Sequence, residues 1–209
     1  MADPIALPVK RLPKQTLHHV WAPKLSRTVV LAGRDLLHLW VMLEAHPAVS
    51  RYCERPTWPD ETEASPEPDF WALRGGSAIW LALGNAPRCE PPAALPLPAL
   101  PTIEWIRTEA LDEHRVWIQN WLSLLPYLSS AGAPGVDPLV PLVVQAVDPD
   151  TSFDELERRF SATEPLLVRT AAIAALHQGL LVSEDLKHKQ WDRFTRISKL
   201  EAWEPDETR

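Results

Sequence analysis

Two apolar runs separated by a glycine turn are the feature that most constrains the fold of this chain. Residues 68–73 (Pro-Asp-Phe-Trp-Ala-Leu) and 78–83 (Ala-Ile-Trp-Leu-Ala-Leu) flank the turn sequence Arg-Gly-Gly-Ser at 74–77. Short apolar and aromatic runs on both sides of a glycine-containing turn are typical of a β-hairpin. The pattern therefore predicts a hairpin over residues 69–83, with Asp69 at the head of its first strand.

The patterns on both sides of this hairpin alternate between helical and extended spacing. Leu36, Leu39 and Leu43 recur at helical spacing, and Pro47 marks the end of that helix. The sequence predicts helices over 34–46 and 109–125, strands over 49–54 and 102–107, and a stiff, proline-rich connector over 87–101. Helices interleaved with strands indicate an α/β domain with a small sheet.

The last third of the chain is predicted to be mainly helical. A helix entered through proline is expected over 138–147, and Ser152 with Glu155 forms a capping-box pattern that opens a second helix. A third helix is expected to end at Gly179, and residues 180–182 then form a short strand. Three helices followed by a strand is the order of a winged-helix domain.

The third predicted helix, over 164–178, is poorly equipped to read DNA bases. A DNA-reading helix presents several Lys, Arg, Asn or Gln side chains on one face. Here only Arg169, His177 and Gln178 are suitable, and the body of the helix is a run of Leu, Val, Ala and Ile. This composition favours packing against protein.

Composition divides the chain into a basic arm, two domains and a tail. The basic, proline-spaced N-terminal arm spans 1–27, the α/β domain 28–128, the helical domain 138–200 and the acidic tail 201–209. Residues 129–137, rich in Ser, Gly and Pro, are the predicted boundary between the domains. At this length the chain can bury a large core without disulfide bonds.

The 209-residue chain has a formal net charge of −7, but its charge is unevenly distributed. Residues 1–34 carry six Lys and Arg against one Asp, residues 35–164 carry eight against twenty Asp and Glu, and residues 185–200 carry five against two Asp. Basic ends around an acidic middle suit limited contact with nucleic-acid phosphates or with an acidic partner. Solvated termini without a partner would show the same pattern.

The residues expected to contact DNA or a protein partner lie in the two basic ends. In the N-terminal arm they are Lys10, Arg11, Lys14, Lys24 and Arg27, and near the C-terminus they are Lys187, Lys189, Trp191, Arg193, Arg196 and Lys199. Basic residues interleaved with aromatic ones can contact a phosphate backbone or insert into the groove of a partner. The alternative for residues 187–199 is an amphipathic closing helix packed on its own domain.

Cysteine usage and hydropathy indicate a cytoplasmic protein. Cys53 and Cys89 form neither a disulfide framework nor a set of zinc ligands, which fits a reducing compartment. The first residues lack the apolar stretch of a signal peptide, and no apolar run approaches the ~18 residues needed to cross a membrane. We therefore expect no membrane contact.

Several short motifs resemble the TnsA-type endonuclease subunit of heteromeric, Tn-seven-like transposases. The matching segments are residues 43–49 (Leu-Glu-Ala-His-Pro-Ala-Val), 52–56 (Tyr-Cys-Glu-Arg-Pro), 68–70 (Pro-Asp-Phe) and 108–124, which carries the Thr-Glu, Asn-Trp and Leu of a family helix. The final third of the chain is similar to the small C-terminal winged-helix domain of the family. The resemblance covers residues 20–185.

The resemblance implies a restriction-endonuclease-like fold, a small mixed sheet with flanking helices, followed by a winged-helix-like domain. Family members cut the 5′ ends of a transposon while a DDE-type transposase cuts the 3′ ends, and the resemblance also implies an AAA+ transposition regulator and DNA as partners. Their metal site uses a helical Glu, an Asp on the first strand of the hairpin, and an acid or amide two residues before a Lys on the second strand.

Only part of that metal site carries over to this sequence. Asp69 matches the aspartate of the first strand, and Asp35 is the nearest stand-in for the helical glutamate. The acid and the lysine fall on Leu81 and Leu83, which can neither bind a metal nor transfer a proton. Because one aspartate cannot hold Mg²⁺ for phosphodiester hydrolysis, the resemblance predicts a nuclease-like fold that does not cut and has no cofactor.

Two alternatives stay open at the level of the sequence. The first is an active metal-dependent endonuclease that uses Mg²⁺ and relocated ligands such as Glu90 or Glu104 to cut transposon 5′ ends. The second is a stand-alone winged-helix DNA-binding or adaptor protein with no link to a transposon. An ordinary hairpin would also carry Leu81 and Leu83 on its inward face, and Asp69 as a hydrogen-bonded structural residue.

Overall fold

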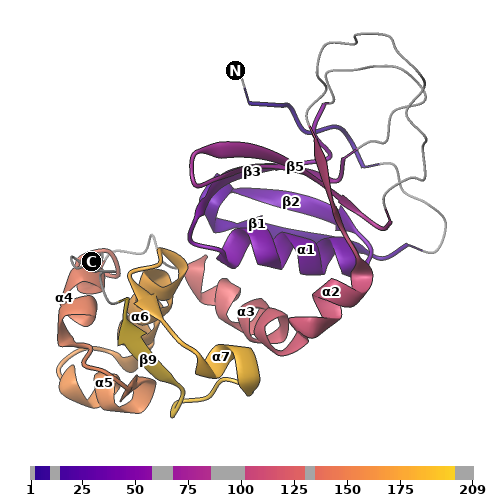
Figure 1. Ribbon diagram of the computed structural model, residues 1–209. Coiled ribbons are helices and arrows are strands. Elements are labelled where there is room, and N and C mark those ends of the chain that lie inside the picture. The colour runs from indigo at the N-terminus through magenta and orange to yellow at the C-terminus, as the bar shows by residue number, and fades with distance from the viewer. Residues whose placement is uncertain (1–2, 10–14, 58–67, 86–101, 130–134, 201–209) are drawn as a thin grey trace, which may run out of the picture. The chain divides into compact units, whose positions relative to one another are not determined.

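The protein is a mixed α/β chain that divides into two compact units, Met1–Ile118 and Gln119–Arg209. The computed structural model describes residues 3–9, 15–57, 68–85, 102–129 and 135–200 (Figure 1). The division between the units falls inside a helix, whereas composition placed it in residues 129–137. No helix in the described ranges is long and apolar enough to span a membrane.

The N-terminal unit begins with a β-hairpin in place of the second half of the predicted extended arm. Strand β1 (Leu17–Ala22) pairs antiparallel with β2 (Arg27–Ala32) across a short 3-10 helix, Pro23–Leu25. The arm predicted over 1–27 therefore ends before β1. The physical reason is the β-branched run in β2, where Val29 and Leu31 are buried and alternate with more accessible positions.

Helix α1 is joined to the sheet by a buried hydrogen-bond network. The helix spans Arg34–Ala45 and strand β3 spans Val49–Glu54, as the sequence predicted. The Tyr52 hydroxyl accepts a hydrogen bond from Trp40 Nε1 at 2.6 Å and donates one to Glu44 Oε2 at 2.5 Å. Because Trp40 and Glu44 lie one turn apart on α1, a single hydroxyl of β3 fixes which helix face meets the sheet.

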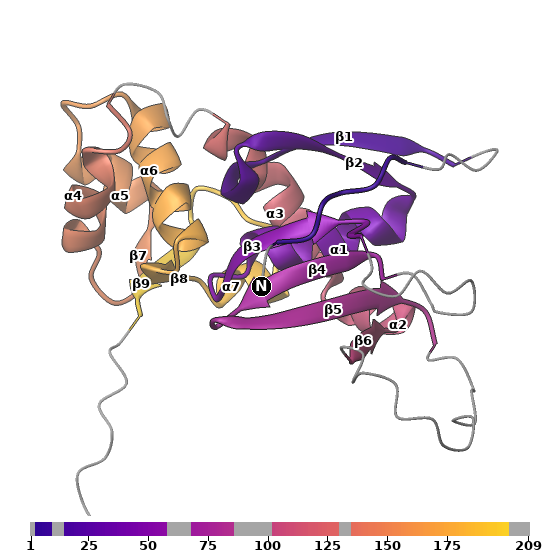
Figure 2. The same ribbon diagram turned by 90° about the horizontal axis from the view of Figure 1, so that it is seen from above.

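A four-stranded mixed sheet forms the centre of the N-terminal unit (Figure 2). Its order is β3-β4-β5-β6, with β4 at Phe70–Arg74, β5 at Ser77–Leu83 and β6 at Ile103–Ile106. The first three strands are antiparallel, and β6 runs parallel to β5. The predicted hairpin is confirmed, with Gly75 and Gly76 in left-handed conformations at its turn.

One face of this sheet carries a row of large apolar side chains. The strand register aligns Cys53, Trp71, Trp80 and Ile103 across the four strands. Cys53 and the two tryptophans are buried, and Ala6 of the N-terminal segment packs against them. Since side chains directly opposite each other stabilise a sheet, this row favours a single register for all four strands.

The helix predicted over 109–125 is divided into two. Helix α2 (Thr108–Glu113) and helix α3 (Arg115–Leu128) are separated at His114, whose φ of −98° and ψ of 14° interrupt the helical backbone. Leu111, on α2, is buried. The boundary between the two compact units then falls within α3, just after Ile118.

In the residues that the structure describes, the C-terminal unit contains the end of α3, three further main helices and a small antiparallel sheet (Figure 2). Its elements are α4 (Leu139–Ala146), β7 (Thr151–Ser152), α5 (Phe153–Arg159), α6 (Pro165–His177), β8 (Leu181–Val182), α7 (Asp185–His188) and β9 (Arg196–Lys199). The sheet order is β7-β9-β8. Helix α6 packs against α4, α5 and β8, and every residue from Thr170 to Leu176 is buried.

The local signals predicted for this unit are confirmed. Ser152 and Glu155 form the capping box, because Glu155 N–H donates to Ser152 Oγ at 3.2 Å and Ser152 N–H donates to Glu155 Oε2 at 2.8 Å. Gly179 follows α6 with a φ of 75°, and the Leu180 N–H donates to the Ala175 carbonyl at 2.9 Å. This is the left-handed helix ending that glycine allows.

Removal of the Tyr52 hydroxyl tests the network between α1 and β3. Tyr52→Phe removes the acceptor that Trp40 Nε1 uses and the donor that the Tyr52 hydroxyl supplies to Glu44 Oε2 in a buried site, so we expect a loss of about 2–3 kcal/mol in the free energy of unfolding. Urea unfolding followed by tryptophan fluorescence measures it. Tyr127→Phe is the matched control, because that hydroxyl bonds to Arg169 at a half-buried position. Equal losses in both variants would contradict the prediction.

Candidate functional site

Asp69 lies just before β4 and forms hydrogen bonds with residues at the ends of β3 and β5. Its backbone N–H donates to the Leu81 carbonyl at 2.8 Å, and its carbonyl accepts from the Arg55 N–H at 2.7 Å. Its carboxylate Oδ2 accepts a hydrogen bond from the Leu83 N–H at 2.7 Å. The side chain thus completes the backbone hydrogen bonding at the open end of the β4–β5 hairpin, beside the exit of β3.

The electrostatic surroundings of Asp69 disfavour its charge. Burial raises the pKa of the Asp69 carboxyl above its usual value, and the hydrogen bond from the Leu83 N–H offsets part of that rise. In the described part of the chain no cation forms an ion pair with this carboxylate. A metal-binding aspartate shares its ion with further oxygen ligands, whereas the described partner of Asp69 is a backbone amide.

Leu81 and Leu83 occupy structural positions in β5. Leu81 is buried and lies opposite Phe70 of β4 in the strand register. Leu83 lies opposite Ile106 of β6. Neither side chain can donate an electron pair to a metal, so these two positions, which the sequence motifs matched to the acid and the lysine of the family, contribute apolar packing.

Of the other carboxylates considered as ligands, only Glu104 has a described ion pair. Asp35 lies in the first turn of α1, within electrostatic reach of the buried His38. Glu104 pairs with Arg74 at 3.1 Å, and Glu90 lies outside the described residues. Among the residues that the structure describes, no three His, Cys, Asp or Glu side chains form a group that could bind a metal. The donor set that the structure describes around Asp69 therefore does not match the several oxygen ligands that Mg²⁺ takes.

Two buried carboxylates were not singled out by the sequence as site residues. Glu54 forms a fork with Arg27, with N···O distances of 2.5 and 2.7 Å. Glu44 accepts hydrogen bonds from the Tyr52 hydroxyl and from the Lys24 N–H. The pairing of Trp40 and Glu44 at helical spacing is the signal that could have indicated a shared partner. Both carboxylates have structural hydrogen bonds.

Lys24 and Arg27, expected to contact DNA or a partner, have partners inside the fold. Lys24 Nζ donates to two carbonyls at the C-terminal end of α1, at 3.0 and 2.6 Å. Burial lowers the pKa of Lys24 to about 8, although Glu44 opposes this shift. Arg27 is held by Glu54. Lys10, Arg11 and Lys14 lie outside the described residues.

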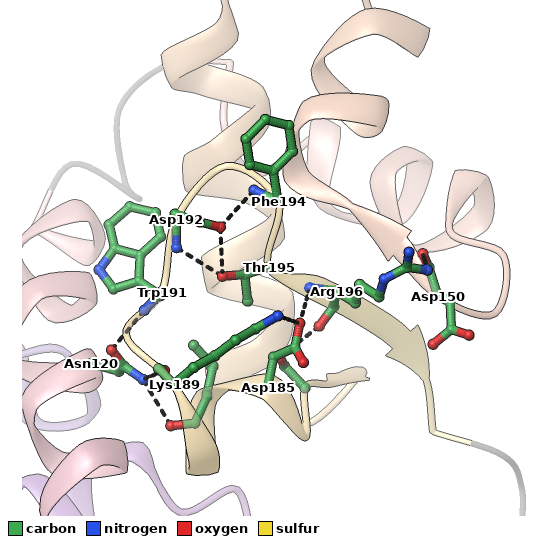
Figure 3. A network of polar contacts seen from close by, with 11 residues as sticks. Asn120, Asp150, Asp185, Lys189, Trp191, Asp192, Phe194, Thr195 and Arg196 are labelled. Carbon is green, nitrogen blue, oxygen red and sulfur yellow. Dashed lines mark hydrogen bonds and ion pairs between the residues drawn. The ribbon is translucent and has the colours of Figure 1, made fainter.

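The basic segment 187–199 is not the closing helix considered as an alternative, since it comprises the end of α7, a loop and β9 (Figure 3). Most of its cations have partners in the same unit. Lys187 pairs with Glu184 at 2.7 Å, Lys189 pairs with Asp185 at 2.9 Å, Arg196 donates to the Asp150 carbonyl at 3.2 Å, and Lys199 donates to the Gln145 carbonyl at 3.1 Å.

Asn120 of α3 fixes the loop that contains Trp191. Its Nδ2 donates to the carbonyls of Leu186 and Lys189 at 2.8 and 2.7 Å, and its Oδ1 accepts from the Trp191 N–H at 2.9 Å. The Trp191 indole N–H donates to Ser123 Oγ at 2.8 Å. Trp191 therefore serves the packing of its own unit in this structure.

Arg193 differs from the other cations of this segment. Its guanidinium lies over the ring of Phe194, 4.6 Å from the ring centroid. Within the described ranges its side chain has no hydrogen bond and no ion pair. Of the described residues expected to contact DNA or a partner, Arg193 is thus the cation whose side chain is least occupied by contacts within the protein.

Helix α6 does not present a face for reading DNA. The residues from Thr170 to Leu176 are at most 5% exposed, and Arg169 is paired with Glu157 of α5 at 2.6 Å. A recognition helix must expose several polar side chains to enter the major groove. The expectation that this helix packs against protein is consistent with its position at the centre of the unit.

The raised pKa of Asp69 gives a testable pH dependence of stability. Below the usual Asp pKa the carboxyl is neutral in both the folded and the unfolded states, so the wild type and Asp69→Asn should be similarly stable. As the pH rises through the raised folded-state pKa, the wild type must bury a charge and should lose stability relative to Asp69→Asn.

Urea unfolding of both proteins between pH 3.5 and pH 7 measures this difference. Asp69→Ala is the control, because it also removes the acceptor of the Leu83 N–H and should be less stable than Asp69→Asn by about 1–2 kcal/mol. A wild type that gains stability over Asp69→Asn as the pH rises would show that Asp69 has a cationic partner.

The chain was compared with protein families and with curated protein sequences. No family model matches the chain, and no curated protein sequence matches it significantly.

Proposed function

We propose that this protein is a TnsA-like subunit of a DNA transposition complex that does not itself cut DNA. The observation that carries the proposal is the state of Asp69, which is half-buried and bonded to the Leu83 N–H, while leucines occupy positions 81 and 83. The proposed role is structural or regulatory, through contacts with a DDE-type transposase, an AAA+ regulator and DNA.

The arrangement of the elements is compatible with this proposal. Helix α1 followed by the antiparallel strands β3, β4 and β5, with β6 parallel to β5, is a small mixed sheet with flanking helices. Its Asp69 stands at the head of the hairpin, as in the restriction-endonuclease-like fold that the motifs imply. In the C-terminal unit the order of three helices followed by β8 fits a winged helix.

In this role the nuclease-like sheet serves as a scaffold. The chemistry of strand cleavage would need further metal ligands and a proton-transferring group beside Asp69, and among the described residues no three His, Cys, Asp or Glu side chains form a group that could bind a metal. The buried Glu44–Tyr52–Trp40 network and the apolar row across the sheet make the unit rigid. A rigid surface is suited to binding partners without large losses of conformational entropy.

The proposal predicts that the purified protein leaves DNA intact. Supercoiled plasmid incubated with the protein in Mg²⁺ or Mn²⁺ should not be nicked, and calorimetric titration with Mn²⁺ should show no binding that Asp69→Ala removes. Nicking that is lost in Asp69→Ala would overturn the proposal in favour of the active endonuclease with relocated ligands.

A silent site also predicts the product of transposition. If only the 3′ strands are cut, the element stays joined to its donor, so the products should be cointegrates. Sequencing of the products from cells that carry such an element, with this protein and a DDE-type transposase, would detect them. Simple insertions as the main product, or a transposase that never co-purifies with this protein, would contradict the proposed role.

A further inference from the structure

An exposed turn in the C-terminal unit presents an arginine stacked on an aromatic ring. Phe194 is 54% exposed, although large aromatic side chains are usually buried. The guanidinium of Arg193 lies 4.6 Å from the ring centroid, within the range of a cation–π contact. In Figure 3 the Phe194 ring points away from the polar network that holds the turn.

The backbone of this turn is fixed from both sides. Asp192 Oδ1 accepts from the Phe194 N–H at 2.8 Å, and Thr195 Oγ1 accepts from the Asp192 N–H at 2.8 Å. The carbonyls of Arg193 and Thr195 accept from the first two amides of α5, at 2.8 and 3.3 Å. Because the turn is ordered before any partner binds, the exposed pair can make contacts at a low cost in conformational entropy.

The positive charge near this turn is local and is not a property of the whole unit. Residues 119–200 carry eight Lys and Arg against ten Asp and Glu, so the unit as a whole does not attract a polyanion. Lys187 and Lys189 are neutralised by carboxylates. Arg196 and Lys199 bind carbonyl oxygens, and Arg196 also lies within electrostatic reach of Asp185 and Glu155, so Lys199 and Arg193 are the cations of this region without a described carboxylate partner.

We propose that Arg193 and Phe194 form a contact point for a DNA strand with unpaired bases. The ring of Phe194 stacks on a base, and the Arg193 guanidinium binds the adjacent phosphate. A nucleotide has an aromatic base next to an anionic phosphate, so it can contact Phe194 and Arg193 at the same time. A carboxylate or an apolar group alone could contact only one of the two side chains. Because α6 is buried, this turn is the described element of the unit that we assign to DNA, and the inference rests on the proposed role in transposition.

The test is fluorescence anisotropy of a labelled oligothymidylate with the full-length protein, repeated from low to moderate salt. Phe194→Ala should weaken binding about tenfold without changing the salt dependence, because stacking releases no counterions. Arg193→Ala should also weaken binding and should lower the slope of log affinity against log salt by about 0.7, the value for one phosphate of a single strand. A duplex of the same length should bind more weakly.

Lys187→Ala is the matched control, since that ammonium is in the same segment but paired with Glu184, and its affinity should stay within about twofold of the wild type. The exposed side chains of Arg193 and Phe194 have no hydrogen bonds in the described residues, so both variants should fold, as circular dichroism would verify. An unchanged affinity in both variants, or no binding by the wild type, would overturn the inference.

Two further outcomes separate this inference from the proposed function. Variants that bind the oligonucleotide normally but no longer co-purify with the transposase would show that the turn is a protein-docking site, and the DNA contact would be rejected. The plasmid-nicking assay does not depend on Arg193 or Phe194, so a failure of this inference leaves the non-cutting role standing.

Discussion

The buried carboxylate of Glu44 is the interaction on which the N-terminal unit depends, because it joins three elements that are separate in the sequence. One oxygen accepts the Lys24 N–H from the turn after β1, and the other accepts the Tyr52 hydroxyl of β3. A buried charge is costly unless it is hydrogen-bonded, so arrangements that lack these partners are strongly disfavoured. The Lys24 ammonium adds to this by bonding to the carbonyls at the end of α1.

The same use of carboxylates explains why the described part of this unit shows no cluster of metal ligands. Glu44, Glu54 and Asp69 each have a different hydrogen-bonding partner: a tyrosine, an arginine and a backbone amide. A divalent metal needs several oxygen ligands that converge on one point. In this sheet the inward carboxylates are dispersed among separate structural contacts, and each of them stabilises a junction between elements.

Local chemistry in the sequence was sufficient to predict many of the elements. The capping box of Ser152 and Glu155 and the helix ending at Gly179 depend on neighbouring residues alone, as does the Gly-Gly turn of the β4–β5 hairpin. The β1–β2 hairpin was missed because its turn begins at Pro23 and lacks a glycine signal. The break at His114 was missed because the apolar spacing continues through it.

The candidate site was harder to predict, because the partner of a charged side chain depends on tertiary structure. The pairs Lys187–Glu184 and Lys189–Asp185 lie at helical spacing and could have been predicted. Arg27 and Glu54 are 27 residues apart, and only the packing of the turn at Pro23–Leu25 against β3 unites them. The buried state of Glu44 likewise follows from the fold and from no local pattern.

The position of α3 determines where the chain could be divided, either into fragments in the laboratory or by recombination between genes. The Ser-, Gly- and Pro-rich residues 129–137 look like a linker, but a fragment that begins there would lack Asn120, whose amide makes one hydrogen bond to α7 and two to the loop before β9. That fragment would lose the hydrogen bonds that hold this loop. The break at His114 is therefore the better place to divide the chain. Recombination that transferred the C-terminal unit from one gene to another would have to transfer α3 as well.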